Sequence, residues 1–289
     1  MAFAVFTEGA SNLPGRILKE YDIRVLPCSY TMDGEHLQYE GDIEAFDSHA
    51  YYDKLRAGAH MKTTLLNSHL FETTFRPVLE GGQDVGYVGM SSGISGTIQA
   101  ARIAGEELMA QFPGRTVRVV DSLGAGFGTG LLAIRAAQLR QEGKSAGEAG
   151  EVLDGEVMYT LQFFTVDDLN FLKRSGRVSG ATAAIGTVLH IKPILWGDPT
   201  GHIVALSKVR GRKKDIAALA EQYESHLPQE GVRLLAISHG DCPEDAQALA
   251  EALTAIHRPR ELIVCPHEPF TGSHVGPGML AVFFQGTHR

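Results

Sequence analysis

The chain has 289 residues, of which 44% are hydrophobic and 21% are charged, and its formal net charge at pH 7 is -8. This composition is typical of a globular protein large enough for two lobes, and the negative charge argues against non-specific binding to nucleic acid, which needs many lysines and arginines. No apolar run approaches the roughly 20 residues of a membrane span. The first residues also lack the basic and long apolar regions of a signal peptide, so we expect no stable membrane insertion.

In the first half of the chain, short apolar runs alternate with segments of helical period. The predicted strands are residues 3–6, 23–30, 85–90 and 117–120, and the predicted helices are residues 13–21, 43–55, 68–79, 97–111 and 127–141. Alternation of strands and helices is typical of βαβ units. We therefore predict a parallel sheet covered by helices.

The third predicted strand leads into Ser91 and Ser92, within the sequence G-M-S-S-G at residues 89–93. This matches the G-x-S-x-G spacing of a hydrolase nucleophile, with His274 as a base in the Ser…Asp…His order of α/β-hydrolases. Two other interpretations are open: a site where backbone N–H groups converge on an anion, or a turn whose hydroxyl caps the next helix. Because Gly93 and Gly96 interrupt the passage from serine to helix, we predict that Ser91 is not a covalent nucleophile.

Two glycine-rich segments resemble nucleotide-binding loops but do not match them. The glycines of residues 121–130 miss the G-x-G-x-x-G spacing, and the Gly-Lys-Ser at 143–145 has Gln138 where a P-loop needs glycine. We therefore expect no nucleotide cofactor.

The second half of the chain has more closely spaced strand-like runs. The predicted strands are residues 161–166, 190–195, 203–207, 232–238, 261–265 and 280–284, and the predicted helices are residues 168–173, 214–226 and 243–256. Residues 197–201 are typical of a hairpin turn. We predict a second α/β lobe with a mixed sheet, so that the lobes span residues 1–158 and 159–289. Because no Pro/Ser-rich linker separates them, the lobes should pack closely and form a junction of the kind that often binds ligands.

Charged residues cluster at three places. Asp167 and Asp168 are either paired carboxylates or, as is more common, the start of a helix that Gly176 ends. The basic segments 173–177 and 207–215 are either solvated edges or sites that dock an acidic partner or guide a phosphorylated ligand.

The cysteines give information about the compartment. Cys28, Cys242 and Cys265 are an odd number without the spacing of a metal site, and the chain has no H-E-x-x-H sequence. We predict reduced, buried thiols, no metal and a cytoplasmic protein, because disulfides persist mainly in oxidising compartments.

Eight segments in order make the chain resemble the DegV family of fatty-acid-binding proteins, which includes the FakB subunits of bacterial fatty acid kinase. They are FTEGASNLP near the start, KTTLLNS at 62–68, SSGISGTIQAA at 91–101, FTVDDLNFLKRSGRVSG at 164–180, IKPIL at 191–195, KVRGRKK at 208–214, SHGDCPEDA at 238–246 and TGSHVGPGMLAVFF at 271–284. The resemblance implies a two-lobed α/β fold that forms one DegV domain, with a ligand tunnel between the lobes.

The resemblance also implies a lipid-binding protein that is not itself an enzyme. It would bind a long-chain fatty acid such as palmitate, with the carboxylate held by Thr63 and by Ser91 or Ser92, and with His274 nearby. Arg177 and Arg210 would face the catalytic subunit of a fatty acid kinase, which would form the acyl phosphate. The alternative is a serine hydrolase of the lipase or esterase type that uses Ser91 and His274.

The sequence departs from the family pattern at two places. Glu8 and Gly9 replace the usual aspartate and serine of the opening motif, and TTLL at 63–66 replaces the usual T-S-Q-P after the first threonine. The threonine is retained, but the loop around it is less polar than in the family pattern. We therefore expect these positions to affect which acyl chains the protein selects.

Overall fold

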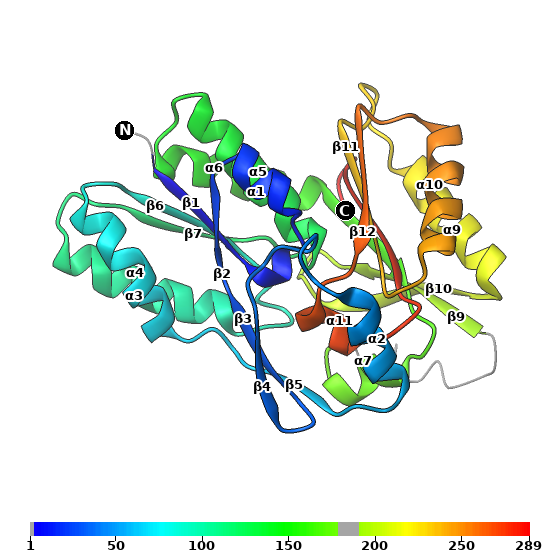
Figure 1. Cartoon of the computed structure of the whole chain (residues 1–289). Coiled ribbons are helices and arrows are strands. Elements are labelled where there is room, and N and C mark those ends of the chain that lie inside the picture. Colours follow the sequence, from blue (N-terminus) through cyan, green and yellow to red (C-terminus); the bar gives the residue numbers. More distant parts are fainter. Residues whose placement is uncertain (1–2, 179–190) are drawn as a thin grey trace.

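A four-stranded parallel sheet forms the centre of the first lobe in the computed structural model, which describes residues 3–178 and 191–289 (Figure 1). Its order is β2-β1-β6-β7, and every pair is parallel. The strands are β1 (Ala4–Glu8), β2 (Ile23–Leu26), β6 (Val85–Gly89) and β7 (Val117–Asp121). β1 and β6 are buried along their whole length, as expected for parallel strands with helices on both faces. The predicted parallel sheet is confirmed.

Helices cover the two faces of this sheet and divide the core between them (Figure 1). The helices on one face are α1 (Gly15–Glu20), α5 (Phe127–Gln141) and α6 (Ala146–Glu156), and those on the other are α3 (Ser68–Glu80) and α4 (Thr97–Gln111). Side chains of β1 alternate between the two faces, because Val5 packs with α5 while Ala4 and Phe6 pack with α3 and α4.

A small antiparallel sheet extends from the first lobe toward the second. It contains β3 (Cys28–Met32), β4 (Glu35–Tyr39) and β5 (Met61–Thr63), with α2 (Ser48–Arg56) between β4 and β5 in the chain. The prediction of one strand over residues 23–30 was wrong, because Pro27 has no N–H for a ladder and separates β2 from β3. The predicted helix over 43–55 begins only at Ser48, after Asp47 accepts a hydrogen bond from the N–H of Ala50.

The second lobe contains a six-stranded mixed sheet in the order β10-β9-β8-β13-β11-β12. Its strands are β8 (Thr160–Thr165), β9 (Ile191–Gly197), β10 (Ile203–Arg210), β11 (Leu234–His239), β12 (Glu261–Pro266) and β13 (Leu280–Gln285). Among the strand pairs of this sheet in the described residues, only β11–β12 is parallel, so the predicted mixed sheet is confirmed. The predicted strand over 190–195 begins one residue outside the described part of the chain.

The two faces of the second sheet have different neighbours. α9 (Arg212–Ser225) and α10 (Pro243–Ile256) cover one face with a separate apolar core. The other face contributes Ala281 and Phe283 to the core that contains Phe127 of α5, so α5 lies between the two sheets. The predicted turn at residues 197–201 is confirmed by hydrogen bonds from Asp198 N to His202 O and from Gly201 N to Asp198 O, both 2.9 Å long.

Two short helices lie where the lobes meet, α7 (Asn170–Ser175) and α11 (Pro269–Val275). α7 ends at Gly176, whose φ of 69° is left-handed, as predicted for a C-cap. Asp168 accepts a hydrogen bond from the N–H of Asn170 at the start of α7, whereas Asp167 forms ion pairs elsewhere. Since α11 packs against α2, β3 and β5 across the junction, the division at residues 158 and 159 remains a proposal.

Two further expectations concern the thiols and membrane insertion. Cys28, Cys242 and Cys265 form no disulfide, but only Cys28 and Cys265 are buried, so the prediction of burial was wrong for the partly exposed Cys242. Among the helices in the described ranges, none has both the length and the apolar character needed to cross a bilayer.

Candidate ligand-binding site

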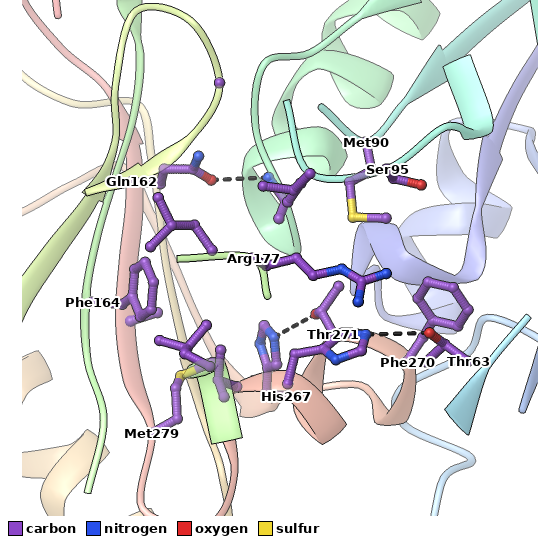
Figure 2. Close-up of a pocket in the computed structure, with 18 of the residues that line it drawn as sticks. Thr63, Met90, Ser95, Gln162, Phe164, Arg177, His267, Phe270, Thr271 and Met279 are labelled. Atoms are coloured by element: carbon purple, nitrogen blue, oxygen red, sulfur yellow. Dashed lines mark hydrogen bonds between the residues drawn. The ribbon is translucent and has the colours of Figure 1, made fainter. Parts of the chain in front are cut away.

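A largely apolar cavity of about 410 Å³ lies between the two lobes (Figure 2). This volume falls within the roughly 300–1,000 Å³ that is usual for small-molecule sites. The apolar side chains of its wall are Leu65, Met90, Ile94, Ala125, Phe164, Leu172, Ile203, Phe270, Val275, Met279, Ala281 and Phe283. They come from both lobes, so the cavity exists only because the lobes pack together.

Thr63 and His274 meet in the wall of this cavity. Thr63 is the last residue of β5 and His274 lies in the last turn of α11, and the Thr63 hydroxyl is 3.2 Å from Nε2 of His274. Burial, together with the nearby charge of Arg177, lowers the pKa of His274 to about 4. At neutral pH the pair is therefore a hydroxyl and an uncharged imidazole, both able to form hydrogen bonds with an anion.

The two predicted serines occupy different positions. Ser92 lines the cavity, whereas Ser91 is fully buried behind it. The Ser91 hydroxyl donates to Gly201 O at 2.8 Å and accepts from Gly93 N at 3.0 Å. Its hydrogen-bonding capacity is thus used by the backbone, and Ser92 is the serine that faces the cavity.

The hydrogen bonds of the Ser91 hydroxyl also test the serine hydrolase alternative. A serine nucleophile needs a base within hydrogen-bond reach. Within residues 3–178 and 191–289, no histidine is hydrogen-bonded to Ser91, and the histidine proposed as its base, His274, is bonded to Thr63. The hydrolase alternative is therefore not supported.

The two arginines predicted to face a partner also lie apart. Arg177 follows α7 and lines the cavity, where its charge contributes to the low pKa of His274. Arg210 is exposed at the end of β10, next to Ile191 of β9, and lies outside the residues that line the cavity.

Several polar residues of the wall were not predicted. His267 bonds to Ser238 through Nδ1 and to Thr271 through Nε2, each at 2.8 Å, and burial lowers the pKa of His267 to about 3. Gln162 accepts a hydrogen bond of 3.0 Å from Ala125 N. The only sequence signal for them was that His267 lies two residues after the predicted strand 261–265, in a connecting segment of the kind where site residues often lie.

Ser95 also lines the cavity and was not singled out in advance. Its hydroxyl donates to Thr97 at 3.0 Å and accepts from Thr97 N at 3.3 Å. Ser95 thus supports the first turn of α4 from the position before its N-cap. The N-cap itself is Gly96, so no serine or threonine of the loop caps this helix in the predicted way.

Glu8, one of the departures from the family pattern, lies behind the cavity wall. It is fully buried, and its Oε1 accepts hydrogen bonds from Met90 N at 2.6 Å and from the Tyr87 hydroxyl at 3.1 Å. Burial raises the pKa of Glu8 to about 7. Because Met90 lines the cavity, the carboxyl of Glu8 fixes part of its wall.

A second hollow, here called the polar groove, adjoins the cavity and has a volume of about 1030 Å³. The two hollows share three residues, Thr63, Arg177 and His274. The other charged residues of the groove are Arg56, Lys62, Asp167, Asp168, Arg174, Arg212, Asp241 and Asp245. The hydrogen-bonding pair of the cavity therefore lies at the boundary between an apolar space and a charged one.

Comparisons with known proteins place the chain among related sequences. The family model described as "Uncharacterised protein, DegV family" matches residues 2–287. A DegV domain-containing protein of Clostridium perfringens is 35% identical over 285 residues, which cover 98% of this chain and 97% of that protein. Another from Lactococcus lactis is 34% identical over 283 residues, with 98% and 97% covered.

Solved structures show the same fold. A structure from Thermus thermophilus, described by its fatty acid binding, has a TM-score of 0.86 and 29% identity, with 99% of this chain and 100% of that chain covered. A fatty acid binding protein from Bacillus subtilis has a TM-score of 0.83 and 27% identity, with 99% and 100% covered.

Proposed function

Because this chain belongs to the DegV family, we propose that it binds a long-chain fatty acid in the cavity between its lobes. The observation that carries the proposal is an apolar cavity of about 410 Å³ whose wall includes a neutral hydrogen-bonding pair, Thr63 and His274. The fatty acid binding described for the structures from Thermus thermophilus and Bacillus subtilis supports it.

The energetics favour a ligand of this kind. At about 0.8 kcal/mol for each buried methylene, a sixteen-carbon chain contributes on the order of 10 kcal/mol before the costs of binding. The head group therefore needs orientation more than strong attraction. We assign that role to Thr63, Ser92 and His274, which offer hydroxyls and an uncharged imidazole.

We further propose that a separate kinase subunit acts on the bound carboxylate. Thr63 and His274 line both hollows, so a carboxylate placed there would be reached through the polar groove. A carboxylate oxygen would attack the terminal phosphorus of ATP held by the partner, which gives an acyl phosphate and ADP. Arg177 and Arg210 would contact that partner, and the free thiols suit a reducing cytoplasm.

The ligand can be identified directly. The purified protein is denatured, its organic extract is analysed by mass spectrometry, and we expect about one fatty acid per chain. An empty protein, or one that releases a nucleotide, would contradict the proposal.

A variant locates the ligand in the cavity. Ala281→Leu adds bulk to the cavity wall and should lower the affinity of delipidated protein for palmitate at least tenfold, because packed interiors tolerate added volume poorly. The matched control is Ala248→Leu on the exposed face of α10, which should bind as the wild type does. Thermal unfolding of both variants checks that they are folded.

A further inference from the structure

We propose that Glu268 is a positioning residue for the head group of the ligand. Its buried carboxylate holds the first turn of α11, and α11 carries His274 in its last turn. The inference rests on the proposed function and deepens it, because it names the group that sets where His274 meets the carboxylate of the lipid.

α11 brings both apolar and polar residues to the cavity. Phe270 and Val275 belong to the apolar wall, whereas Thr271 and His274 are among its polar residues. α11 has only seven residues, which is about two turns, and a helix this short is not stable by itself in water. The orientation of His274 therefore depends on the groups that hold α11 from outside.

The carboxylate of Glu268 accepts hydrogen bonds from the free N–H groups at the start of α11. Its Oε2 accepts from Phe270 N at 2.5 Å, and its Oε1 accepts from Thr271 N at 2.9 Å and from the Thr271 hydroxyl. Glu268 is fully buried, and no lysine or arginine in the described part of the chain forms an ion pair with it. These three donors are therefore the groups that compensate the burial of the carboxylate.

Other hydrogen bonds hold the chain just before the helix. From α2, Tyr51 donates to Pro269 O at 2.6 Å and Tyr52 donates to His267 O at 3.0 Å. These two bonds fix where α11 begins. The carboxylate of Glu268 instead holds the second and third residues of the helix, so it fixes the direction in which the helix runs.

Thr271 also connects Glu268 to a chain of buried hydrogen bonds. Nε2 of His267 lies 2.8 Å from the Thr271 hydroxyl, and Nδ1 of His267 lies 2.8 Å from the Ser238 hydroxyl. Because an ionised carboxylate can only accept, the Thr271 hydroxyl donates to Glu268. His267 then donates to Thr271 through Nε2, and Ser238 donates to Nδ1. The chain thus runs from β11 toward Glu268 and adds to the hold on the first turn of α11.

A small shift of α11 should affect the head group more than the acyl chain. The Thr63 hydroxyl and Nε2 of His274 are 3.2 Å apart, and hydrogen bonds weaken steeply when their geometry is disturbed. Apolar contact is non-directional and tolerates a small shift better. Loss of the Glu268 carboxylate should therefore weaken the binding of a carboxylate more than that of a lipid with an uncharged head group.

Palmitate and hexadecanol, whose chains have equal length, test this with delipidated protein at pH 8. Burial raises the pKa of Glu268 to about 7, so the wild type carries the charge at this pH. Glu268→Ala should bind palmitate roughly fivefold or more weakly, and hexadecanol less than about twofold more weakly. Removal of a negative charge would by itself favour an anionic ligand, so weaker binding of palmitate reports lost position and not lost charge.

Three further variants complete the experiment. Glu268→Asp keeps a carboxylate at a position where aspartate is a favoured N-cap, so it should restore most of the affinity for palmitate. Ser145→Ala removes the N-cap of α6 and should lower the midpoint of thermal unfolding without changing either affinity. If the alanine variant does not fold, Glu268→Gln keeps the shape with one acceptor oxygen and should bind palmitate roughly threefold more weakly.

The other outcomes are distinguishable. If the wild type binds palmitate and Glu268→Ala binds it equally well, or loses both lipids equally, Glu268 is not a positioning residue while the proposed function stands. The same holds if Glu268→Asp binds no better than Glu268→Ala, or if Glu268→Gln keeps full affinity where the alanine variant does not fold. If the wild type binds neither lipid, the proposed function itself fails.

Discussion

The Ser91 hydroxyl donates a hydrogen bond of 2.8 Å to the carbonyl oxygen of Gly201 and thereby joins the loop after β6 to the turn between β9 and β10. The contact is close on both sides: a Cβ on Gly201 would lie 2.1 Å from Ser91 Oγ, and one on Gly93 would lie 2.7 Å from Gly201 O. The two lobes thus meet through glycines beside the cavity. Ser91, which matched a nucleophile motif in the sequence, therefore connects the two lobes.

Substitution of the two serines should separate stability from binding. Ser91→Ala leaves the buried carbonyl of Gly201 without this donor and should lower the free energy of unfolding by roughly 1–3 kcal/mol. Ser92→Ala removes an exposed hydroxyl from the cavity wall and should weaken fatty acid binding several-fold with unchanged stability. Urea denaturation and lipid titration measure the two effects, and the opposite assignment would show that Ser91 is the ligand's partner.

Thr63→Ala tests the other hydrogen-bonding residue. Loss of one donor to a charged acceptor costs roughly 1.5–3 kcal/mol, so the affinity for palmitate should fall about tenfold or more. Thr64→Ala is the matched control, since Thr64 is exposed and lies outside the cavity wall. An unchanged affinity for the Thr63 variant would remove this hydroxyl from the site.

A fluorophosphonate probe should leave the protein unlabelled, even after the lipid has been stripped. The Ser91 hydroxyl is bonded to backbone groups and has no histidine beside it in the described part of the chain, so nothing activates it. Ester substrates should be hydrolysed no faster than by the Ser91→Ala variant. Stoichiometric labelling at Ser91 would restore the hydrolase hypothesis.

Local sequence signals account for which elements could be predicted. α4, α5 and α10 have the predicted ends, because each combines an apolar stripe with a clear boundary, such as Pro243 at the start of α10. β4 was missed because it is largely exposed and shows little alternation. α6 was missed because its glycines mask a helix that Ser145 and Glu148 stabilise with a capping box.

Only part of the site could be predicted from the sequence. The family-like segments pointed to Thr63, Ser92 and His274, which the fold does bring to the cavity. The apolar wall was not foreseen, because Phe164 and Ala281 lie in apolar runs of their strands, as ordinary core residues do. A cavity forms where the side chains of the two lobes do not fill the space between them. The distance between the lobes depends on the whole fold, so it cannot be inferred from any single segment of the sequence.

Arg210→Glu tests the proposed kinase partner. Arg210 is exposed and lies outside the cavity wall, so palmitate binding should be unchanged while acyl phosphate formation with the kinase subunit falls at least tenfold. Arg102→Glu makes the same charge change on the exposed face of α4 and should retain activity. Equal activity of the two variants would exclude Arg210 from the contact with the partner.

The carboxyl of Glu8 makes stability depend on pH in a direction that can be worked out. Burial raises its pKa from 4.5 to about 7, so the folded state binds this proton more tightly than the unfolded state does. The contribution to the free energy of unfolding is therefore complete below about pH 4.5 and is lost as the pH rises through 7. The loss is on the order of 3 kcal/mol.

Glu8→Gln should abolish that part of the pH dependence. Glutamine keeps an oxygen that can accept from Met90 N and the Tyr87 hydroxyl but has no proton to lose. Relative to the wild type, the variant should gain stability steadily between pH 5 and 8 in urea denaturation. Glu268, whose pKa burial also raises to about 7, and His267, whose pKa burial lowers, are present in both proteins, so their contributions largely cancel in the difference. The exposed Glu20→Gln variant should give a flat difference across this range, and an equally flat result for Glu8→Gln would mean that Glu8 is ionised in the folded protein throughout.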